Sequence, residues 1–185
     1  MKITIKFRSK IIIEAIEPFI SPGKRLHDVG CGNGVVSREI EKHFKCFLTG
    51  TDILDYRLEK INFKKMLCED RLDFEDKSYD IGLFTDVLHH IPFATQIKLI
   101  KEALRVCPLV LIIEVKPTFA AKLIDYTVNQ IHNKDMQIIY TFRNEREWQE
   151  LFRKNKITST YIKVSKPFSL YPITNYLFCL RSPSN

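Results

Sequence analysis

Residues 27–34 read His-Asp-Val-Gly-Cys-Gly-Asn-Gly, so three of the six glycines of the chain lie within five residues. The stretch overlaps the end of a segment, 25–29, that is interpreted as a short strand running into the glycines. It precedes a segment, 35–44, whose apolar residues recur at helical spacing. Glycines at a strand-to-helix turn let the backbone approach a ligand closely at the carboxyl edge of a sheet. The stretch therefore predicts a nucleotide-binding crevice.

Strand-like and helix-like segments alternate along the rest of the chain. Apolar runs predict strands at 25–29, 46–51, 65–68, 79–84, 109–115, 157–164 and 176–181. Helical spacing of apolar residues predicts helices at 9–20, 35–44, 93–106, 118–132 and 143–154. Such alternation is typical of an α/β protein with a mostly parallel sheet. The last two strands are joined by a loop without a helix, which favours an antiparallel pair.

The composition is that of a globular protein. The chain has 185 residues, of which 45% are hydrophobic and 28% charged. One domain is expected, because domains run to about 100–200 residues. The apolar fraction excludes a disordered chain, and five scattered cysteines, an odd number, exclude a disulfide scaffold.

The positive charge is unevenly distributed. Residues 1–92 hold 15 basic and 15 acidic side chains, so the formal net charge of +7 lies entirely in residues 93–185. A basic surface of this kind can face nucleic acid, an anionic membrane surface or an acidic substrate. A solvated surface without a specific partner is the plainer interpretation.

No targeting or membrane-spanning segment is expected. The apolar N-terminal stretch is interrupted by Glu14, Glu17 and Pro18, and no small-residue cleavage site follows it. The longest clean apolar run, 106–113, is far shorter than the roughly 20 residues of a membrane span. These features favour a cytoplasmic location with reduced cysteines.

The glycine stretch also indicates what the ligand is. A dinucleotide fingerprint requires G-x-G-x-x-G, whereas Gly34 comes one residue early. In addition, the carboxylate of Asp28 would repel a pyrophosphate at the helix N-terminus. The ligand is therefore expected to lack phosphate and to carry positive charge, and S-adenosylmethionine meets both conditions.

The chain resembles the class I S-adenosylmethionine-dependent methyltransferases, of the methyltransferase type 11 kind, over nearly its whole length. Residues 28–34 match the first motif of that family, D-x-G-x-G-x-G, without a gap. The resemblance implies an α/β fold, with a doubly wound, Rossmann-like, seven-stranded and mostly parallel sheet whose final strand is antiparallel. It also implies methyl transfer with S-adenosyl-L-methionine as the cofactor.

Three further segments match family motifs in the same order. Asp52 matches the acid that bonds both ribose hydroxyls, with Asp55 as the alternative, and it lies about 20 residues beyond the loop, as ribose recognition requires. Residues 68–71 match the segment whose acid meets the adenine amine, and residues 85–91 match the fourth motif. The resemblance thus implies as cofactor-binding residues Asp28, Gly30, Cys31, Gly32, Asp52, Ile53, Glu69, Asp70, Arg71, Thr85, Asp86 and Val87.

Several of these residues have a structural alternative. Asp28 is expected near the ammonium group of the cofactor, but a carboxylate there could instead cap the following helix. Glu69 and Asp70 compete for the adenine contact. Gly34 could serve helix packing alone, and Trp148 is expected to pack in the core rather than to line an acceptor pocket.

His89 and His90 are the candidate catalytic pair. A histidine titrates near neutrality and can take a proton from an attacking hydroxyl or nitrogen. His89 falls where related O-methyltransferases place a base in an L-H-D pattern, but here His90 stands in place of the Asp. The alternative is that one ring lines the cofactor pocket and the other bonds the backbone. No metal site is expected, because the other three histidines are isolated and no cysteine pair has zinc spacing.

The resemblance implies one methyltransferase domain over 1–185. It divides into an N-terminal helix at 1–22, a cofactor-binding half at 23–116 and an acceptor-side half at 117–185, with a candidate lid at 118–140. An apolar lid suits an aromatic or lipid-like acceptor, and the basic half suits an anionic one. Family members that methylate exocyclic amines or amides carry an Asn/Asp-Pro-Pro-aromatic motif after the fourth strand. Residues 85–88 read Thr-Asp-Val-Leu instead, so the resemblance disfavours such acceptors.

Two alternatives belong to other functional classes. An RNA methyltransferase would use the basic C-terminal third to contact phosphates. A non-catalytic subunit that retains the fold would bind no S-adenosylmethionine, although the glycine stretch and Asp52 argue against it.

Overall fold

The computed structural model describes residues 2–132, 139–168 and 171–181. In this part of the chain seven strands form one sheet in the order β3-β2-β1-β4-β5-β7-β6. The strands are β1 Arg25–Val29, β2 Phe47–Asp52, β3 Asn62–Lys65, β4 Ile81–Thr85, β5 Leu109–Val115, β6 Thr158–Lys163 and β7 Asn175–Arg181. Only β7 is reversed: it pairs antiparallel with both β5 and β6. The predicted doubly wound, Rossmann-like seven-stranded sheet with an antiparallel final strand is confirmed.

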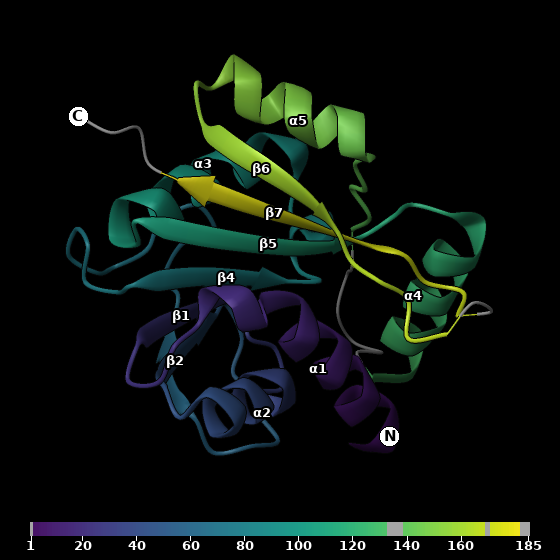
Figure 1. Cartoon of the computed structure of the whole chain (residues 1–185), viewed down its shortest axis with the longest axis horizontal. Coiled ribbons are helices and arrows are strands. Elements are labelled where there is room, and N and C mark those ends of the chain that lie inside the picture. Colours follow the sequence, from purple (N-terminus) through teal and green to yellow (C-terminus); the bar gives the residue numbers. More distant parts are fainter. Residues whose placement is uncertain (1, 133–138, 169–170, 182–185) are drawn as a thin grey trace.

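Five α-helices accompany the described strands. They are α1 Lys2–Ile16, α2 Val35–Phe44, α3 Phe93–Val106, α4 Phe119–His132 and α5 Glu145–Lys154, with short 3-10 helices η1 Glu17–Phe19 and η2 Leu88–His90. In Figure 1, α1 and α2 lie in front of the sheet and α3 lies behind it, while α4 lies beyond the carboxyl end of β5. None of the helices in the described ranges is long and apolar enough to span a bilayer.

Strand order places a ligand site at one edge. β1 and β4 are neighbours in the sheet. From β1 the chain adds β2 and β3 on one side, and from β4 it adds β5, β7 and β6 on the other, so the order of the strands reverses between β1 and β4. Doubly wound sheets bind their ligands outside the carboxyl ends of the strands at such a switch point. The glycine stretch directly follows β1, so the fold positions it at this edge.

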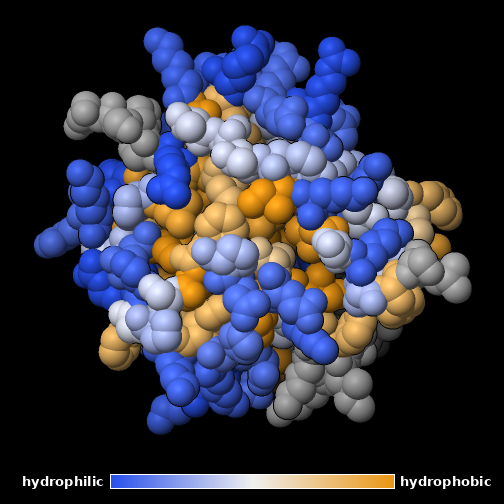
Figure 2. Space-filling model, viewed as in Figure 1, coloured by the Kyte–Doolittle hydropathy of each residue, from blue (hydrophilic) through white to orange (hydrophobic). Residues whose placement is uncertain are grey.

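Two hydrophobic clusters hold the layers together, one on each side of the sheet. One joins α1 and α2 to the sheet through residues such as Ile16, Ile40 and Leu83. The other joins α3 and α5 to it and contains Trp148, which is 1% exposed, so the predicted core role of this residue is confirmed. Figure 2 shows hydrophilic side chains over α5 at the top and around α2 at the bottom, with hydrophobic side chains between them.

Most predicted elements are confirmed to within two residues at each end, but the first helix and the third strand are misplaced. The first helix begins at Lys2 instead of residue 9, and it ends at Ile16, where a 3-10 turn containing Pro18 follows. A proline lacks the N–H that a helix interior requires.

The third strand is Asn62–Lys65 instead of 65–68. Its pairing with β2 ends at Lys65, opposite Asp52, and Cys68 instead forms an isolated bridge with Arg71. The apolar Met66 and Leu67 suggested a strand, but Leu67 is 86% exposed.

Candidate cofactor and acceptor site

The glycine stretch is tied to the neighbouring strand by its backbone. The N–H groups of Gly30 and Cys31 both donate to the Thr51 carbonyl of β2, at 2.7 and 3.0 Å. Gly30 has φ +74°, and a Cβ there would lie 2.2 Å from Cγ2 of Val87. Because Val87 follows β4, the loop lies against the fourth motif, and only a glycine fits between them.

Asp52, at the end of β2, reaches across to the glycine stretch. Its Oδ2 accepts the Gly32 N–H at 2.9 Å, and its Oδ1 accepts the Leu54 N–H at 3.2 Å. Burial raises the pKa of this carboxyl. The rival residue, Asp55, instead forms an exposed ion pair with Arg57 at 2.8 Å. Of the two predicted acids, therefore, Asp52 lies at the loop, with the exposed Ile53 following it.

Asp28 is buried at the end of β1 and is 1% exposed. Its Oδ2 accepts the Ser37 hydroxyl of α2 at 2.6 Å, while its Oδ1 has no hydrogen-bond partner among the described residues. The Val35 N–H at the start of α2 is bound by the Asn33 side chain at 3.1 Å, so Asp28 does not cap the helix. Burial raises the pKa of Asp28 to about 6. An unpaired buried oxygen of this kind is suited to a cationic donor.

The fourth motif is tied to the N-terminal helix. Both oxygens of Asp86 are bound by Arg8 of α1, with Nε–Oδ2 and Nη2–Oδ1 distances of 2.7 Å each. Asp86 has φ +55°, which turns the chain sharply after Thr85 at the end of β4. Arg8 was missed by sequence reasoning, because no motif surrounds it and 78 residues separate the pair.

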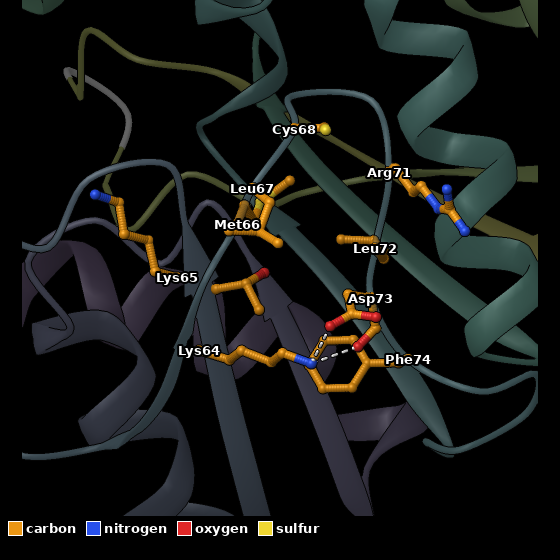
Figure 3. A pocket seen from close by; sticks show the side chains of 10 residues that line it. Lys64, Lys65, Met66, Leu67, Cys68, Arg71, Leu72, Asp73 and Phe74 are labelled. Carbon is orange, nitrogen blue, oxygen red and sulfur yellow. Dashed lines mark hydrogen bonds and ion pairs between the residues drawn. The ribbon is translucent and has the colours of Figure 1, made fainter.

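The predicted adenine segment is more open. Glu69 is exposed, and Asp70 lies 3.2 Å from Lys98 Nζ on α3. Arg71 lines a cavity of about 270 Å³ beside β3, together with Thr51, Lys64, Lys65, Met66, Leu67, Cys68, Leu72, Asp73 and Phe74. Figure 3 shows the Lys64–Asp73 ion pair at one end of this cavity and Cys68 at the other. The cavity therefore lies next to the glycine stretch, but none of residues 28–34 lines it.

The predicted histidine pair lies in η2 and contacts β5. His89 is 1% exposed, and its Nδ1 lies 2.5 Å from Oε2 of Glu114. The other oxygen of Glu114 accepts the N–H groups of Leu88 and Val87, at 2.7 and 3.2 Å. Glu114 thus fixes both the histidine ring and the backbone of the fourth motif. It was missed because it lies within an otherwise apolar strand.

Helix α4 brings a second carboxylate to the same histidines. Oδ1 of Asp125 lies 3.5 Å from Nε2 of His89 and 3.7 Å from Nε2 of His90. Burial lowers the pKa of His89, but Glu114 and Asp125 outweigh that effect and raise it to about 10. Burial raises the pKa of Asp125, whereas hydrogen bonds to the two histidines outweigh this and lower it. The candidate lid is therefore tied to the histidine pair.

Residues 27–108 match the family model described as a methyltransferase domain. Over this stretch the chain is similar to methyltransferase domains, and its fold is that of an S-adenosylmethionine-dependent methyltransferase of known structure. The matched region begins in β1 and contains every predicted site residue, whereas Glu114 and Asp125 lie beyond it.

Solved structures of other proteins share the fold of this chain. An S-adenosylmethionine-dependent methyltransferase from Archaeoglobus fulgidus has a TM-score of 0.71 at 15% identity, covering 98% of this chain and 95% of its own. Phosphoethanolamine N-methyltransferase 2 of Haemonchus contortus, solved with S-adenosyl-L-methionine, has a TM-score of 0.67 at 16% identity, covering 96% of this chain and 52% of its own.

A curated relative is similar over part of the chain. The ubiquinone biosynthesis O-methyltransferase of Neisseria meningitidis serogroup C is 27% identical over 82 residues, which are 38% of this chain and 34% of that protein. The match thus spans about a third of the length of this relative.

The predicted site residues form two groups. The glycine stretch, Asp28, Asp52 and Val87 converge at the carboxyl ends of β1, β2 and β4. The two histidines form a separate group with Glu114 and Asp125. Among the described residues, Asp70 is bound by Lys98, and neither Glu69 nor Asp70 forms a hydrogen bond with the first group.

Proposed function

We propose that this protein transfers a methyl group from S-adenosylmethionine to a small or lipid-like acceptor. The observation that carries the proposal is the convergence of Asp28 and Asp52 on the glycine stretch. One offers a buried, unpaired carboxylate oxygen, and the other places a carboxylate 2.9 Å from the Gly32 N–H. A cationic amino acid joined to a ribose fits these two acids, whereas a pyrophosphate would be repelled.

Each acid then has its own role toward the cofactor. Asp28 accepts a hydrogen bond from the ammonium group, directly or through water, and Ser37 holds the carboxylate for it. Asp52 accepts hydrogen bonds from the ribose hydroxyls. Thr85, Asp86 and Val87 form the wall after β4, with Asp86 braced by Arg8. Cys31, Ile53 and Arg71 complete the contacts, and Glu69 and Asp70 remain the two candidates for the adenine amine.

The acceptor is expected where α4 approaches the carboxyl ends of β4 and β5. Phe119, Leu123 and Tyr126 of this helix are 85%, 51% and 50% exposed, which supports an apolar or aromatic acceptor body. The lid predicted at 118–140 includes residues 133–138, which lie outside the described residues. An oxygen acceptor is supported by the similarity to the ubiquinone biosynthesis O-methyltransferase.

The reaction is an in-line displacement. A lone pair of the acceptor attacks the methyl carbon, the carbon–sulfur bond breaks, and the sulfonium becomes a neutral thioether. Holding the two reactants in line can supply about 7–11 kcal/mol of the barrier. The protein's task is therefore to orient the acceptor and exclude water, and a base is needed only where the acceptor must lose a proton.

The two histidines are better placed for positioning or binding than for proton removal. The nitrogens of His89 face Glu114 and Asp125, at 2.5 and 3.5 Å. Those of His90 face the Ile139 carbonyl and Asp125, at 3.2 and 3.7 Å. A general base needs a nitrogen within reach of the acceptor proton. The general-base role of either histidine stays a prediction.

The division of residues 1–185 into cofactor-binding and acceptor-side halves likewise stays a proposal. A cytoplasmic location is supported by the five cysteines, all of which are free in the structure.

A methyl-transfer screen tests the proposed function. The full chain and its Asp52→Ala variant are incubated with labelled S-adenosylmethionine and cell extract separated into small-molecule, lipid, RNA and protein fractions. Label in the small-molecule or lipid fraction, lost in the variant, supports the proposal. Label in RNA alone would favour the basic C-terminal third as an RNA-binding surface, and no cofactor binding by calorimetry would indicate a non-catalytic subunit.

A further inference from the structure

Three metal-ligating side chains meet outside the cofactor site. His89 and His90 come from η2, Asp125 comes from α4, and each offers one ligand atom within 4.8 Å of the other two. Oδ1 of Asp125 lies 3.5 Å from Nε2 of His89 and 3.7 Å from Nε2 of His90. We propose that His89, His90 and Asp125 form a binding site for a divalent transition-metal ion.

The hydrogen bonds around the cluster orient the donors toward one another. Nδ1 of His89 faces the Glu114 carboxylate at 2.5 Å, and Nδ1 of His90 faces the Ile139 carbonyl at 3.2 Å. Both partners are acceptors, so each ring can donate its Nδ1–H to them and directs Nε2 toward Asp125. Two histidine nitrogens that face one carboxylate are arranged to share a cation with it.

The groups that hold the two histidines are of the kind that hold metal ligands. Metal-ligating histidines usually donate their other N–H to a carboxylate or a backbone carbonyl, which fixes the ring and its tautomer. Glu114 does this for His89, and the N–H groups of Val87 and Leu88 hold Glu114 in turn. Phe142 stacks on the His89 ring, with centroids 4.7 Å apart. The ligand group is thus held rigidly before any ion binds.

Two buried atoms of the cluster support the same inference. Nε2 of His89 and Oδ2 of Asp125 are inaccessible to solvent and have no hydrogen-bond partner among the described residues. His89 as a whole is 1% exposed. A buried polar atom without a partner is destabilising by about 1–3 kcal/mol. A bound metal ion gives the His89 nitrogen the partner that it lacks and fixes the Asp125 carboxylate in place.

The donor set selects the kind of ion. Two imidazoles and one carboxylate suit Zn²⁺, Fe²⁺, Co²⁺ or Ni²⁺, whereas Mg²⁺ and Ca²⁺ prefer oxygen ligands. Metal–ligand bonds of about 2.0–2.2 Å separate neighbouring ligand atoms by about 3.4 Å in a tetrahedral site. The two Asp125 separations of 3.5 and 3.7 Å need only a small contraction, and the ligand atoms of the two histidines lie within 4.8 Å of each other and would move closer as the ion binds. Three protein ligands leave at least one position for water or an acceptor atom.

The spacing rules that excluded a metal in the sequence could not find this site. They look for ligands a few residues apart, whereas Asp125 follows His89 by 36 positions, on a helix that the fold returns to the cluster. The competing interpretation is an ion-pair network in which a proton, instead of a metal ion, lies between the histidines and Asp125.

A metal titration separates the two interpretations, and it does not depend on methyl transfer. The full chain without an affinity tag is freed of metal by a chelator and titrated with Co²⁺ by visible absorption and with Zn²⁺ by calorimetry. We expect one ion per chain, with visible d–d absorption of bound Co²⁺. Asp125→Asn should weaken Zn²⁺ binding at least tenfold, and Glu114→Gln should weaken it about 10–100-fold, because Glu114 holds the His89 ring in place.

The matched control is His43→Ala, which removes a histidine that lies outside the cluster and is half exposed. This variant should bind Zn²⁺ as the unaltered chain does. Circular dichroism and the affinity for S-adenosylmethionine show whether Asp125→Asn keeps the fold and the cofactor site. Absence of Co²⁺ absorption, or equal Zn²⁺ affinity in Asp125→Asn, would overturn the metal site and leave an ion-pair network.

Discussion

The Val87 side chain lies directly over Gly30, so closely that a Cβ added to Gly30 would be 2.2 Å from Cγ2 and 3.0 Å from Cβ of Val87. Gly30 also has φ +74°, a conformation that other L-residues rarely adopt. Two separate constraints therefore require glycine at this position. One is the backbone conformation, and the other is the contact with the fourth motif.

Replacing Gly30 by alanine should lower the free energy of unfolding by about 2–5 kcal/mol, the sum of backbone strain and overpacking. It should also abolish measurable S-adenosylmethionine binding, because the loop must move away from Val87. Denaturant unfolding and calorimetry measure the two effects.

Gly23→Ala is the matched control for backbone strain. Gly23 has φ +79°, but a Cβ there would meet nothing within 4 Å. This variant should lose only about 1–2 kcal/mol, the cost of the left-handed backbone, and should keep its cofactor affinity. Equal losses in both variants would show that the contact with Val87 contributes nothing.

Asp52→Asn should weaken S-adenosylmethionine binding at least tenfold. The carboxylate is the group expected on the ribose hydroxyls, and hydrogen bonds to charged groups contribute about 1.5–3 kcal/mol. Asp55→Asn is the matched control, because Asp55 lies three residues further on and pairs with the Arg57 side chain at the surface. Isothermal calorimetry on both variants checks the assignment. A larger loss in Asp55→Asn would transfer the ribose role to that residue.

Cofactor affinity should depend on pH through Asp28. The pKa of this buried carboxyl is raised to about 6, so below that pH the group is protonated and cannot accept from an ammonium group. Affinity should therefore increase as pH rises from 5 to 7, by at most about tenfold per pH unit. Asp28→Asn should bind weakly with a flat profile, and calorimetry across this range measures both.

Ser37→Ala gives a sharper check on the same carboxyl. The Ser37 hydroxyl lowers the pKa of Asp28, so its loss should move the pH transition of cofactor binding upward.

The effect of Asp28 on folding stability should change with pH in the opposite direction to its effect on cofactor affinity. The folded chain holds the Asp28 proton up to about pH 6, above the ordinary value of 3.8, so this group's contribution to stability decreases as pH rises between the two. A pH slope that survives in Asp28→Asn would exclude Asp28 as its source.

Local patterns predicted the part of the fold that local contacts determine. The strand 25–29, the helices 35–44 and 93–106, and the strand 109–115 have the bounds that were predicted. Each is delimited by residues within the segment itself, by glycines or by a change in apolar spacing. The strand at the sheet edge was misplaced because β3 is set by its pairing with β2 and not by its own apolar residues.

Side chains that complete the site through distant contacts could not be predicted. Glu114 lies among apolar residues of β5, and nothing nearby shows that it bonds His89, 25 positions earlier. Arg8 and Asp125 are single charged residues on amphipathic helices, where solvent exposure is the ordinary expectation. Their partners are determined by how α1 and α4 approach the carboxyl edge of the sheet, which only the assembled fold shows.

The Arg8–Asp86 pair should contribute measurably to the stability of the chain where α1 meets the carboxyl end of β4. Its side chains are 16% and 27% exposed and bonded through two hydrogen bonds of 2.7 Å, so removing one partner leaves a poorly solvated charge. Arg8→Gln and Asp86→Asn should each lower the free energy of unfolding by about 1–3 kcal/mol, and in a double-mutant cycle the two losses should fall well short of adding. Lys10→Gln, which removes an exposed pair with Glu14 at 4.0 Å on the same helix, should change stability by less than about 0.5 kcal/mol. Additive losses in the cycle would mean that α1 is held by its apolar face alone.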